Sequence, residues 1–171
     1  LIVLSPLFII LAIWIKWDSK GPVFYKQVRV GRNNKDFKLY KFRSMRVQKA
    51  DEKNCITRKN DDRITPVGHI IRKLHLDELP QIFNIFAGQM SIIGPRPALW
   101  NQDDLYAERA KYGANGVKPG LTGWAQINGY RGDTSIRKRI EHDLYYIENW
   151  TLGMDIKILF MPLFTGFINK N

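Results

Sequence analysis

The sequence predicts a mainly helical α/β fold, a single compact domain that contains one β-hairpin. The length of 171 residues suits one domain with a substantial hydrophobic core. Two runs rich in β-forming residues, 23–30 and 37–42, enclose the turn signal Gly31-Arg32-Asn33-Asn34, which is typical of a hairpin. Capping residues and apolar periodicity indicate that most of the remaining segments are helical.

Residues 1–15 are almost wholly apolar, and only Ser5-Pro6 interrupts them. A helix needs about 20 residues to span a bilayer, so this run is too short to cross one. Pro6 is expected to break or kink a helix, because proline lacks an N–H and clashes with the preceding turn. From the residues alone, a buried core helix and a membrane-associated helix are equally open.

The second strand ends in Lys41 and Arg43, which the residues alone suggest are solvated charges at a sheet edge. Residues 44–62 are polar and lack apolar periodicity, so a loop is expected there. Thr65-Pro66 supplies an N-cap and a first helical residue for the next helix. Arg72 lies on that helix, as either a surface charge or a support for nearby acidic side chains.

The segment after this helix carries two adjacent acids, Asp77 and Glu78. Residues 79–86 are expected to form a short helix, with Asp77 near its N-cap, Glu78 in its first turn and Gly88 at its C-terminal stop. The free N–H groups and the dipole of such a helix would hold Asp77 ionised and attract phosphate. On the dipeptide alone, both acids could equally serve only as helix caps.

Pro95 and Pro97 enclose Arg96 between two fixed φ angles, which suits bidentate binding of phosphate as well as a simple rigid turn. Residues 101–112 are expected to form an amphipathic helix that Gly113 ends. Thr134 or Ser135 is expected to cap a later helix that carries Asp143 on one face. The apolar face of that helix should comprise Ile136, Ile140, Leu144 and Ile147.

The chain carries 27 Lys and Arg against 16 Asp and Glu, a formal charge of +11. This excess implies an anionic partner: nucleic acid, a nucleotide or the surface of an acidic membrane. The sequence lacks a helix-turn-helix, a zinc finger or an RNP-like aromatic motif, which disfavours a nucleic-acid-binding module. Its single cysteine, Cys55, lies in a charged stretch and cannot form an internal disulfide.

Several long motifs in the correct order resemble one known family. They cover nearly the whole chain: Lys41-Phe42-Arg43-Ser44-Met45, residues 74–84, Gly94-Pro95-Arg96-Pro97, residues 118–129 and Asp143-Leu144-Tyr145-Tyr146-Ile147. The sequence closely resembles the bacterial monotopic phosphoglycosyl transferases, sugar transferases that load a phospho-sugar onto a polyprenyl (undecaprenyl) phosphate.

The resemblance implies a covalent two-step reaction. The aspartate that matches Asp77 attacks the β-phosphate of a UDP-sugar, expels UMP and carries the phospho-sugar until a polyprenyl phosphate attacks it. Glu78 matches a candidate Mg²⁺ ligand of that family. The resemblance places five further residues at the substrate site: Lys41, Arg72, Arg96, Arg131 and Asp143. Arg131 is carried over with an uncertain register after Asn128-Gly129, and Asp143 as either a site residue or the partner of an arginine.

The resemblance also implies a place at the bacterial inner (cytoplasmic) membrane, on its cytosolic face. Residues 1–17 would be the second half of a re-entrant membrane helix, 18–155 the catalytic domain and 156–171 an interfacial C-terminal helix, although a core helix suits the last segment too. The first residue is Leu1, so the start of the re-entrant helix is expected to be missing. An inactive membrane scaffold is the alternative function. The identity of the sugar, the glycan pathway and a homodimer stay open.

Overall fold

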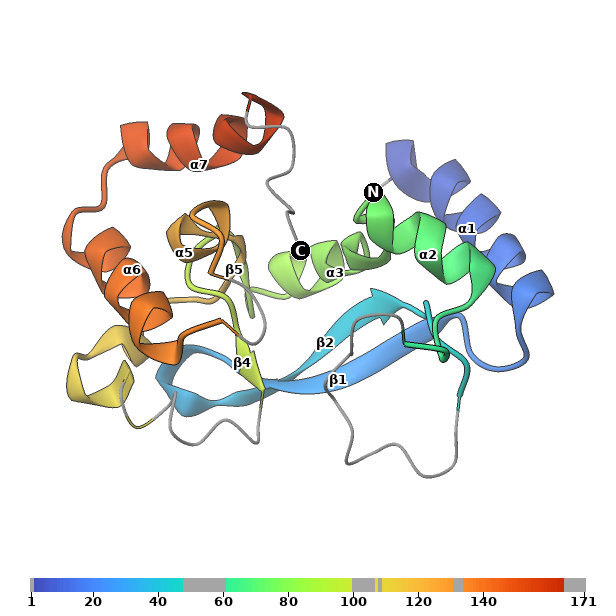
Figure 1. Ribbon diagram of the computed structural model, residues 1–171, viewed down its shortest axis with the longest axis horizontal. Helices are drawn as coiled ribbons and strands as arrows, with labels where there is room; N and C mark the ends of the chain where they lie inside the picture. Colours follow the sequence, from blue (N-terminus) through green and yellow to red (C-terminus); the bar gives the residue numbers. More distant parts are fainter. Residues whose placement is uncertain (1, 48–60, 100–106, 108, 131–133, 165–171) are drawn as a thin grey trace. The chain divides into compact units, whose positions relative to one another are not determined.

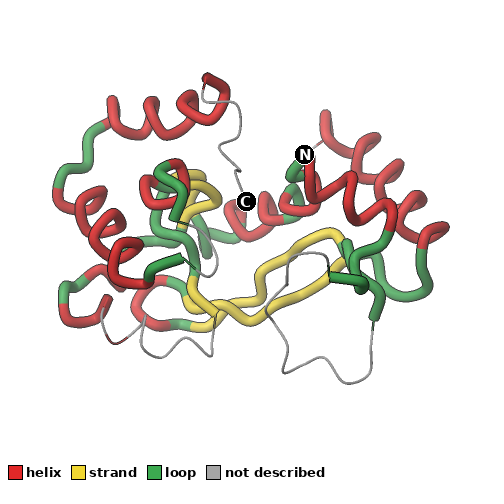
Figure 2. Tube along the Cα trace, in the orientation of Figure 1, coloured by secondary structure: helices red, strands yellow, loops and turns green. Residues whose placement is uncertain are grey.

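The computed structural model describes residues 2–47, 61–99, 107, 109–130 and 134–164 (Figure 1). Helices predominate and the sheets are small, which confirms the mainly helical α/β class (Figure 2). The contacts fall into two units, where the length suggested a single domain. The first unit comprises residues 1–27 and 40–82, and the second comprises residues 28–39 and 83–171.

In the first unit, the short 3-10 helix η1 (Ile2–Leu4) leads into α1 (Ser5–Asp18). Pro6 lies in the first turn of α1, where its missing N–H removes no intrahelical hydrogen bond. Ser5-Pro6 therefore begins this helix and does not interrupt it. Leu11 and Ile15, four residues apart, form the buried face of α1 and are each only 2% exposed.

The rest of α1 exposes apolar side chains, although the helix is apolar nearly all round. The exposed side chains are Ile9, Ile10, Ile13, Trp14 and Trp17, the last of them 85% exposed. A contiguous apolar surface of this kind is unusual on a protein that meets only water. None of the helices in the described ranges has the length and apolar character needed to cross a membrane.

The predicted hairpin is confirmed as β1 (Phe24–Val30) and β2 (Asp36–Phe42), joined through the 3-10 turn η2 (Arg32–Asn34). Asn33 and Asn34 both adopt positive φ angles, 55° and 58°, which asparagine tolerates better than most residues. The short strand β4 (Ala98–Leu99) pairs antiparallel with the far side of β1.

The predicted helix after Thr65 is α2 (Pro66–Lys73), and the Thr65 Oγ1 accepts a hydrogen bond from the Gly68 N–H at 2.9 Å. Helices α1 and α2 pack together in the first unit (Figure 1). Their shared core is built from Leu11, Ile15, Phe42, Val67 and Ile71.

In the second unit, β3 (Ser91–Ile93) pairs in parallel with β5 (Gly120–Thr122). Gly94 and Gly120 bring two backbones into direct contact, because a Cβ atom on Gly120 would lie 2.1 Å from the Gly94 N. Glycine permits this close approach because it carries no Cβ atom. The short helix α3 (Gln81–Phe86) leads toward β3. Gly88, two residues after its end, adopts a φ of +73° and stops the helix, as predicted.

Three further helices complete the second unit: α5 (Trp124–Ile127), α6 (Ile136–Glu148) and α7 (Leu152–Phe164), with the 3-10 turn η4 (Ala114–Gly116) before them. The Ser135 hydroxyl caps α6, as predicted. The predicted apolar face of α6 is confirmed in part: Ile140 is buried and Leu144 packs against it, whereas Ile136 is exposed and the other buried residues are Arg139, Asp143 and Tyr146. The buried face also includes Arg139 and Asp143, because these polar side chains have charged partners in the second unit.

Helix α7 begins at Leu152, four residues before position 156, where the sequence predicted the start of the C-terminal helix. The expected helix over 101–112 lies largely outside the described residues; its described positions 107 and 109–111 are helical, and Gly113 follows in a left-handed conformation.

Candidate active site

Asp77 and Glu78 lie in η3 (Leu76–Glu78), a 3-10 turn that precedes α3. The prediction that Asp77 caps the next helix is therefore wrong. Tight hydrogen bonds explain the difference, since the Glu78 N–H donates to the carbonyl of His75 at 3.2 Å. Pro80 then follows without an N–H, and α3 begins only after it, at Gln81.

His75, directly before η3, adopts a left-handed backbone conformation with φ 55° and ψ 19°. This conformation is uncommon for a residue with a Cβ atom, and strained residues of this kind cluster at functional sites. The His75 N–H donates to the Arg72 carbonyl at 3.1 Å, so the chain turns sharply out of α2. The turn carries Asp77 into the interior of the first unit.

The Asp77 side chain is buried, and the residue is only 8% exposed. Burial is the largest effect on its carboxyl group and raises the pKa of Asp77, and the neighbouring Glu78 raises it further. Positive charge on Lys41, Arg72 and His75 opposes this rise in pKa. The expected lowering by a helix N-terminus is thus overturned, because desolvation outweighs the nearby cations.

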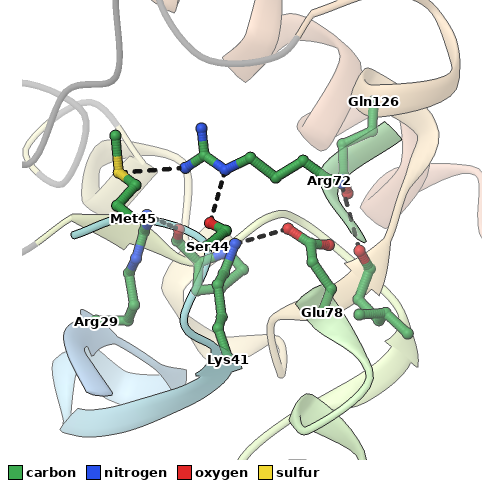
Figure 3. Close-up of polar contacts among 9 residues, drawn as sticks. Arg29, Lys41, Ser44, Met45, Arg72, Glu78 and Gln126 are labelled. Atoms are coloured by element: carbon green, nitrogen blue, oxygen red, sulfur yellow. Dashed lines mark hydrogen bonds and ion pairs between the residues drawn. The ribbon is translucent and has the colours of Figure 1, made fainter. Parts of the chain in front are cut away.

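Glu78 forms an ion pair with Lys41, whose Nζ donates a hydrogen bond to Glu78 Oε1 at 2.7 Å (Figure 3). Both side chains are mostly buried. The structure places Lys41 beside the acidic pair, where the family resemblance had placed it, and the alternative of a solvated strand-edge charge is excluded. The ammonium group brings a fixed positive charge to the two carboxylates.

Arg72, from α2, supplies a second cation near Asp77. Its Nε donates to Ser44 Oγ at 2.8 Å, and its Nη2 contacts Met45 Sδ at 3.6 Å (Figure 3). Ser44 and Met45 directly follow β2 and hold the guanidinium group in one orientation. Arg72 is therefore a partly buried residue with defined packing near Asp77, and the surface-charge alternative is wrong.

Arg43 has a role that the sequence did not reveal. Its guanidinium group is buried and donates to the carbonyl oxygens of Ile15, Ser19 and Lys20 at 3.2, 2.6 and 2.7 Å. These carbonyls belong to the C-terminal end of α1 and the residues just after it, where a helix leaves acceptors unsatisfied. Arg43 thus ties α1 to the strand that also carries Lys41, and the prediction of a solvated charge is wrong for it.

The second unit holds a separate charged cluster around Arg96. The flanking residues Pro95 and Pro97 are buried, and Arg96 is partly exposed. Asp143 on α6 forms a buried ion pair with Arg109. Pairing with an arginine was one of the two roles expected for Asp143. Arg109 and Arg139 were not singled out from the sequence, and only their burial in the fold reveals them.

The predicted site residues thus fall into two groups. Asp77, Glu78, Lys41 and Arg72 come together in the first unit, and Arg96 and Asp143 share the second. Arg131 lies outside the described residues.

The donor chemistry of the first group fits Mg²⁺. This ion prefers carboxylate and phosphate oxygens and is commonly held by one or two carboxylates together with a substrate phosphate and water. Glu78 supplies one such carboxylate, and Lys41 lies close enough to orient it.

Comparison with known proteins shows which family the chain belongs to. The family model described as "Bacterial sugar transferase" matches residues 1–169. A protein of Klebsiella pneumoniae named UDP-glucose:undecaprenyl-phosphate glucose-1-phosphate transferase is 47% identical over 177 residues, covering 100% of this chain and 38% of its own length. A protein of the same name from Escherichia coli K12 is 44% identical and is covered over 38% of its length.

A third relative, from Aeromonas hydrophila, is named UDP-N-acetylgalactosamine-undecaprenyl-phosphate N-acetylgalactosaminephosphotransferase and is 44% identical over 95% of this chain and 40% of its own length. The chain therefore belongs to the bacterial sugar transferase family. It spans about two fifths of the length of these curated relatives.

Proposed function

We propose that the protein transfers a phospho-sugar from a UDP-sugar to undecaprenyl phosphate, or a related polyprenyl phosphate, and releases UMP. This reaction is the first membrane step in assembly of an exopolysaccharide, capsule or other glycan. Membership of the family and the names of the three relatives support it. The observation that carries the proposal is the buried Asp77 carboxylate, set beside Glu78 and facing the positive charges of Lys41 and Arg72.

In the proposed reaction, a carboxylate oxygen of Asp77 attacks the β-phosphorus of the UDP-sugar. A new P–O bond forms, the bond from that phosphorus to the bridging oxygen breaks, and UMP leaves. An oxygen of the polyprenyl phosphate then attacks the same phosphorus, which releases Asp77 and forms a polyprenyl diphosphate sugar. Burial removes water from the Asp77 carboxylate, which makes this weak nucleophile more reactive.

The other predicted residues receive supporting roles in this proposal. Glu78 would hold Mg²⁺ together with the diphosphate, and the ion would offset the negative charge that develops on UMP. Lys41 and Arg72 keep the acidic pair in a positive environment. Arg96 and Arg131 are proposed to bind substrate phosphate, and Asp143 to serve the site through its pairing with Arg109.

The exposed apolar surfaces support a monotopic place on the membrane. Helix α1 would form the part of a re-entrant element within residues 1–17, with Trp14 and Trp17 at the headgroups. Helix α7 exposes Leu152, Ile156 and Phe160 and would lie along the interface, with the catalytic residues between 18 and 155 on the cytosolic side. Anionic lipids would complement the charge of +11.

The test is UMP release by the full-length protein in detergent, with Mg²⁺, a panel of UDP-sugars and no lipid acceptor, followed by intact mass. Stoichiometric UMP and a phospho-sugar adduct are expected, and both should disappear in Asp77→Asn. Asp36→Asn, at an exposed position of β2, is the matched control. A folded protein that forms no adduct with any sugar would overturn the covalent mechanism and favour an inactive scaffold.

A further inference from the structure

The buried face of α6 carries two charged residues, Arg139 and Asp143, that face a third, Arg109. All three are almost fully buried, at 4%, 2% and 7% exposure. Charged residues are rarely buried to this degree unless they are paired, because removing them from water costs several kcal/mol each. Asp143 pairs with Arg109 and supplies the negative charge of the group.

Both arginines make a hydrogen bond to the same main-chain atom. The Nη1 of Arg109 donates to the carbonyl oxygen of Arg96 at 3.2 Å, and the Nη2 of Arg139 donates to that oxygen at 3.3 Å. Residues 109 and 139 lie far from residue 96 in the sequence. Two guanidinium groups therefore converge on one peptide carbonyl and use both of its acceptor lone pairs.

The arrangement has an electrostatic cost. Burial, helped by the positive charges of Arg109 and Arg96, lowers the pKa of Arg139 to about 10, and Asp143 opposes this effect. Arg109 and Arg139 thus share one aspartate, although one arginine would be enough to neutralise it. A simple buried ion pair does not account for the second guanidinium group.

The carbonyl that they bind controls the direction of the Arg96 side chain. Pro95 and Pro97 restrict the backbone on each side of Arg96, and the peptide bond to Pro97 carries the bound oxygen. Pro97 already restricts the ψ angle of Arg96 to extended values, so the two hydrogen bonds anchor an already stiff peptide plane in space. They therefore fix the backbone from which the Arg96 guanidinium projects.

We infer that Arg109 and Arg139, held together by Asp143, are positioning residues that fix the Arg96 main chain so that its guanidinium group meets the diphosphate of the nucleotide sugar. This inference rests on the proposed function. It assigns Asp143 to the support of the arginines and not to contact with substrate. Lysine at position 109 could not bind Asp143 and the Arg96 carbonyl in the same planar geometry, and at position 139 its flexible ammonium group would not present a rigid donor to that carbonyl.

The test is a double-mutant cycle on UMP release by the full-length protein in detergent. Arg139→Lys is expected to raise KM for the UDP-sugar about tenfold and to change kcat less, because a phosphate-binding residue loses its fixed position. In an Arg96→Ala background, the same change should alter KM less than about twofold. Arg137→Lys, an exposed residue of the same helix, is the matched control and should leave KM unchanged.

A second readout does not depend on activity. Hydrogen exchange in the peptide that contains residues 94–98 should be faster in Arg139→Lys than in Arg137→Lys, since the clamp on the Arg96 carbonyl is lost. Equal effects on KM with and without Arg96, or unchanged exchange in this peptide, would overturn the inference. If the parent protein releases no UMP from any sugar, the proposed function fails, and the exchange result alone decides whether the clamp exists.

Discussion

The Lys41 Nζ lies 2.7 Å from Glu78 Oε1 and also places positive charge near Asp77. One cation from the end of β2 therefore serves both members of the acidic pair. Its bond orients Glu78, while its charge offsets part of the cost of burying Asp77. The two acids have different environments although they are neighbours in the chain, and this difference suits a nucleophile beside a metal ligand.

Replacing Lys41 by methionine should shift the acidic limb of the pH–rate profile to higher pH. The positive charge of Lys41 lowers the pKa of Asp77, so its loss raises that pKa and leaves less of the reactive carboxylate at a given pH. We expect kcat/KM for UMP release at neutral pH to fall roughly tenfold or more. Lys38→Met, on an exposed position of the same strand, should leave the limb in place. An unshifted limb in Lys41→Met would contradict the role of this charge.

Asp77→Asn should make the protein more stable while it removes activity. Burial raises the pKa of Asp77, so folding favours the protonated form, and the charged form costs stability once the pH exceeds the ordinary aspartate pKa. Asparagine carries no charge, and we expect a gain on the order of 1 kcal/mol at neutral pH. The gain should shrink as the pH falls toward about 4. Urea unfolding at several pH values measures it, and a variant less stable than the parent at neutral pH would refute this reasoning.

His75 should accept glycine more readily than valine. Glycine adopts the left-handed conformation of His75 without strain, whereas a β-branched residue pays roughly 1–2 kcal/mol for it. His75→Val should therefore lower the free energy of unfolding and also displace Asp77, with loss of adduct formation. His75→Gly should retain the turn. Intact mass with a UDP-sugar and urea unfolding distinguish the two variants, and similar behaviour of both would show that the backbone conformation is not what matters.

Arg43→Met should weaken the attachment of α1. The change removes the hydrogen bonds to the carbonyls of Ile15, Ser19 and Lys20, and we expect a loss of about 3 kcal/mol. Trp14 and Trp17 lie on α1, so their fluorescence reports detachment directly. Arg46→Met, at an exposed position nearby, is the control. Equal unfolding midpoints for the two variants would show that Arg43 does not secure the helix.

Much of the fold could be predicted because its signals are local. The turn at Gly31, the Thr65 cap, the Ser135 cap and the stop at Gly88 each depend on a few consecutive residues whose conformational preferences are strong. The family resemblance supplied the grouping of Lys41 with Glu78. Neither residue's partner could be read from spacing, since the two are 37 positions apart.

One wrong prediction depended on the backbone conformation of neighbouring residues, and another on distant contacts. Asp77 lies in an ordinary capping sequence. The left-handed backbone of His75 and the missing N–H of Pro80 instead place Asp77 in the 3-10 turn η3. Apolar periodicity located only part of the buried face of α6, because Arg139 and Asp143 find partners from other parts of the second unit. Burial of an arginine or aspartate is favourable only with those partners, and a sequence pattern does not contain them.

Each of the five residues 41–45 contacts a partner of its own, so the segment does not tolerate an insertion or a deletion. In order, they pair with Glu78, fill the core, hold the end of α1, and meet Arg72 through two consecutive side chains. A substitution here would disturb one partner. An inserted or deleted residue within this stretch would move every later residue of it away from its partner. The number of residues between Lys41 and Met45 is therefore constrained as strongly as their identity.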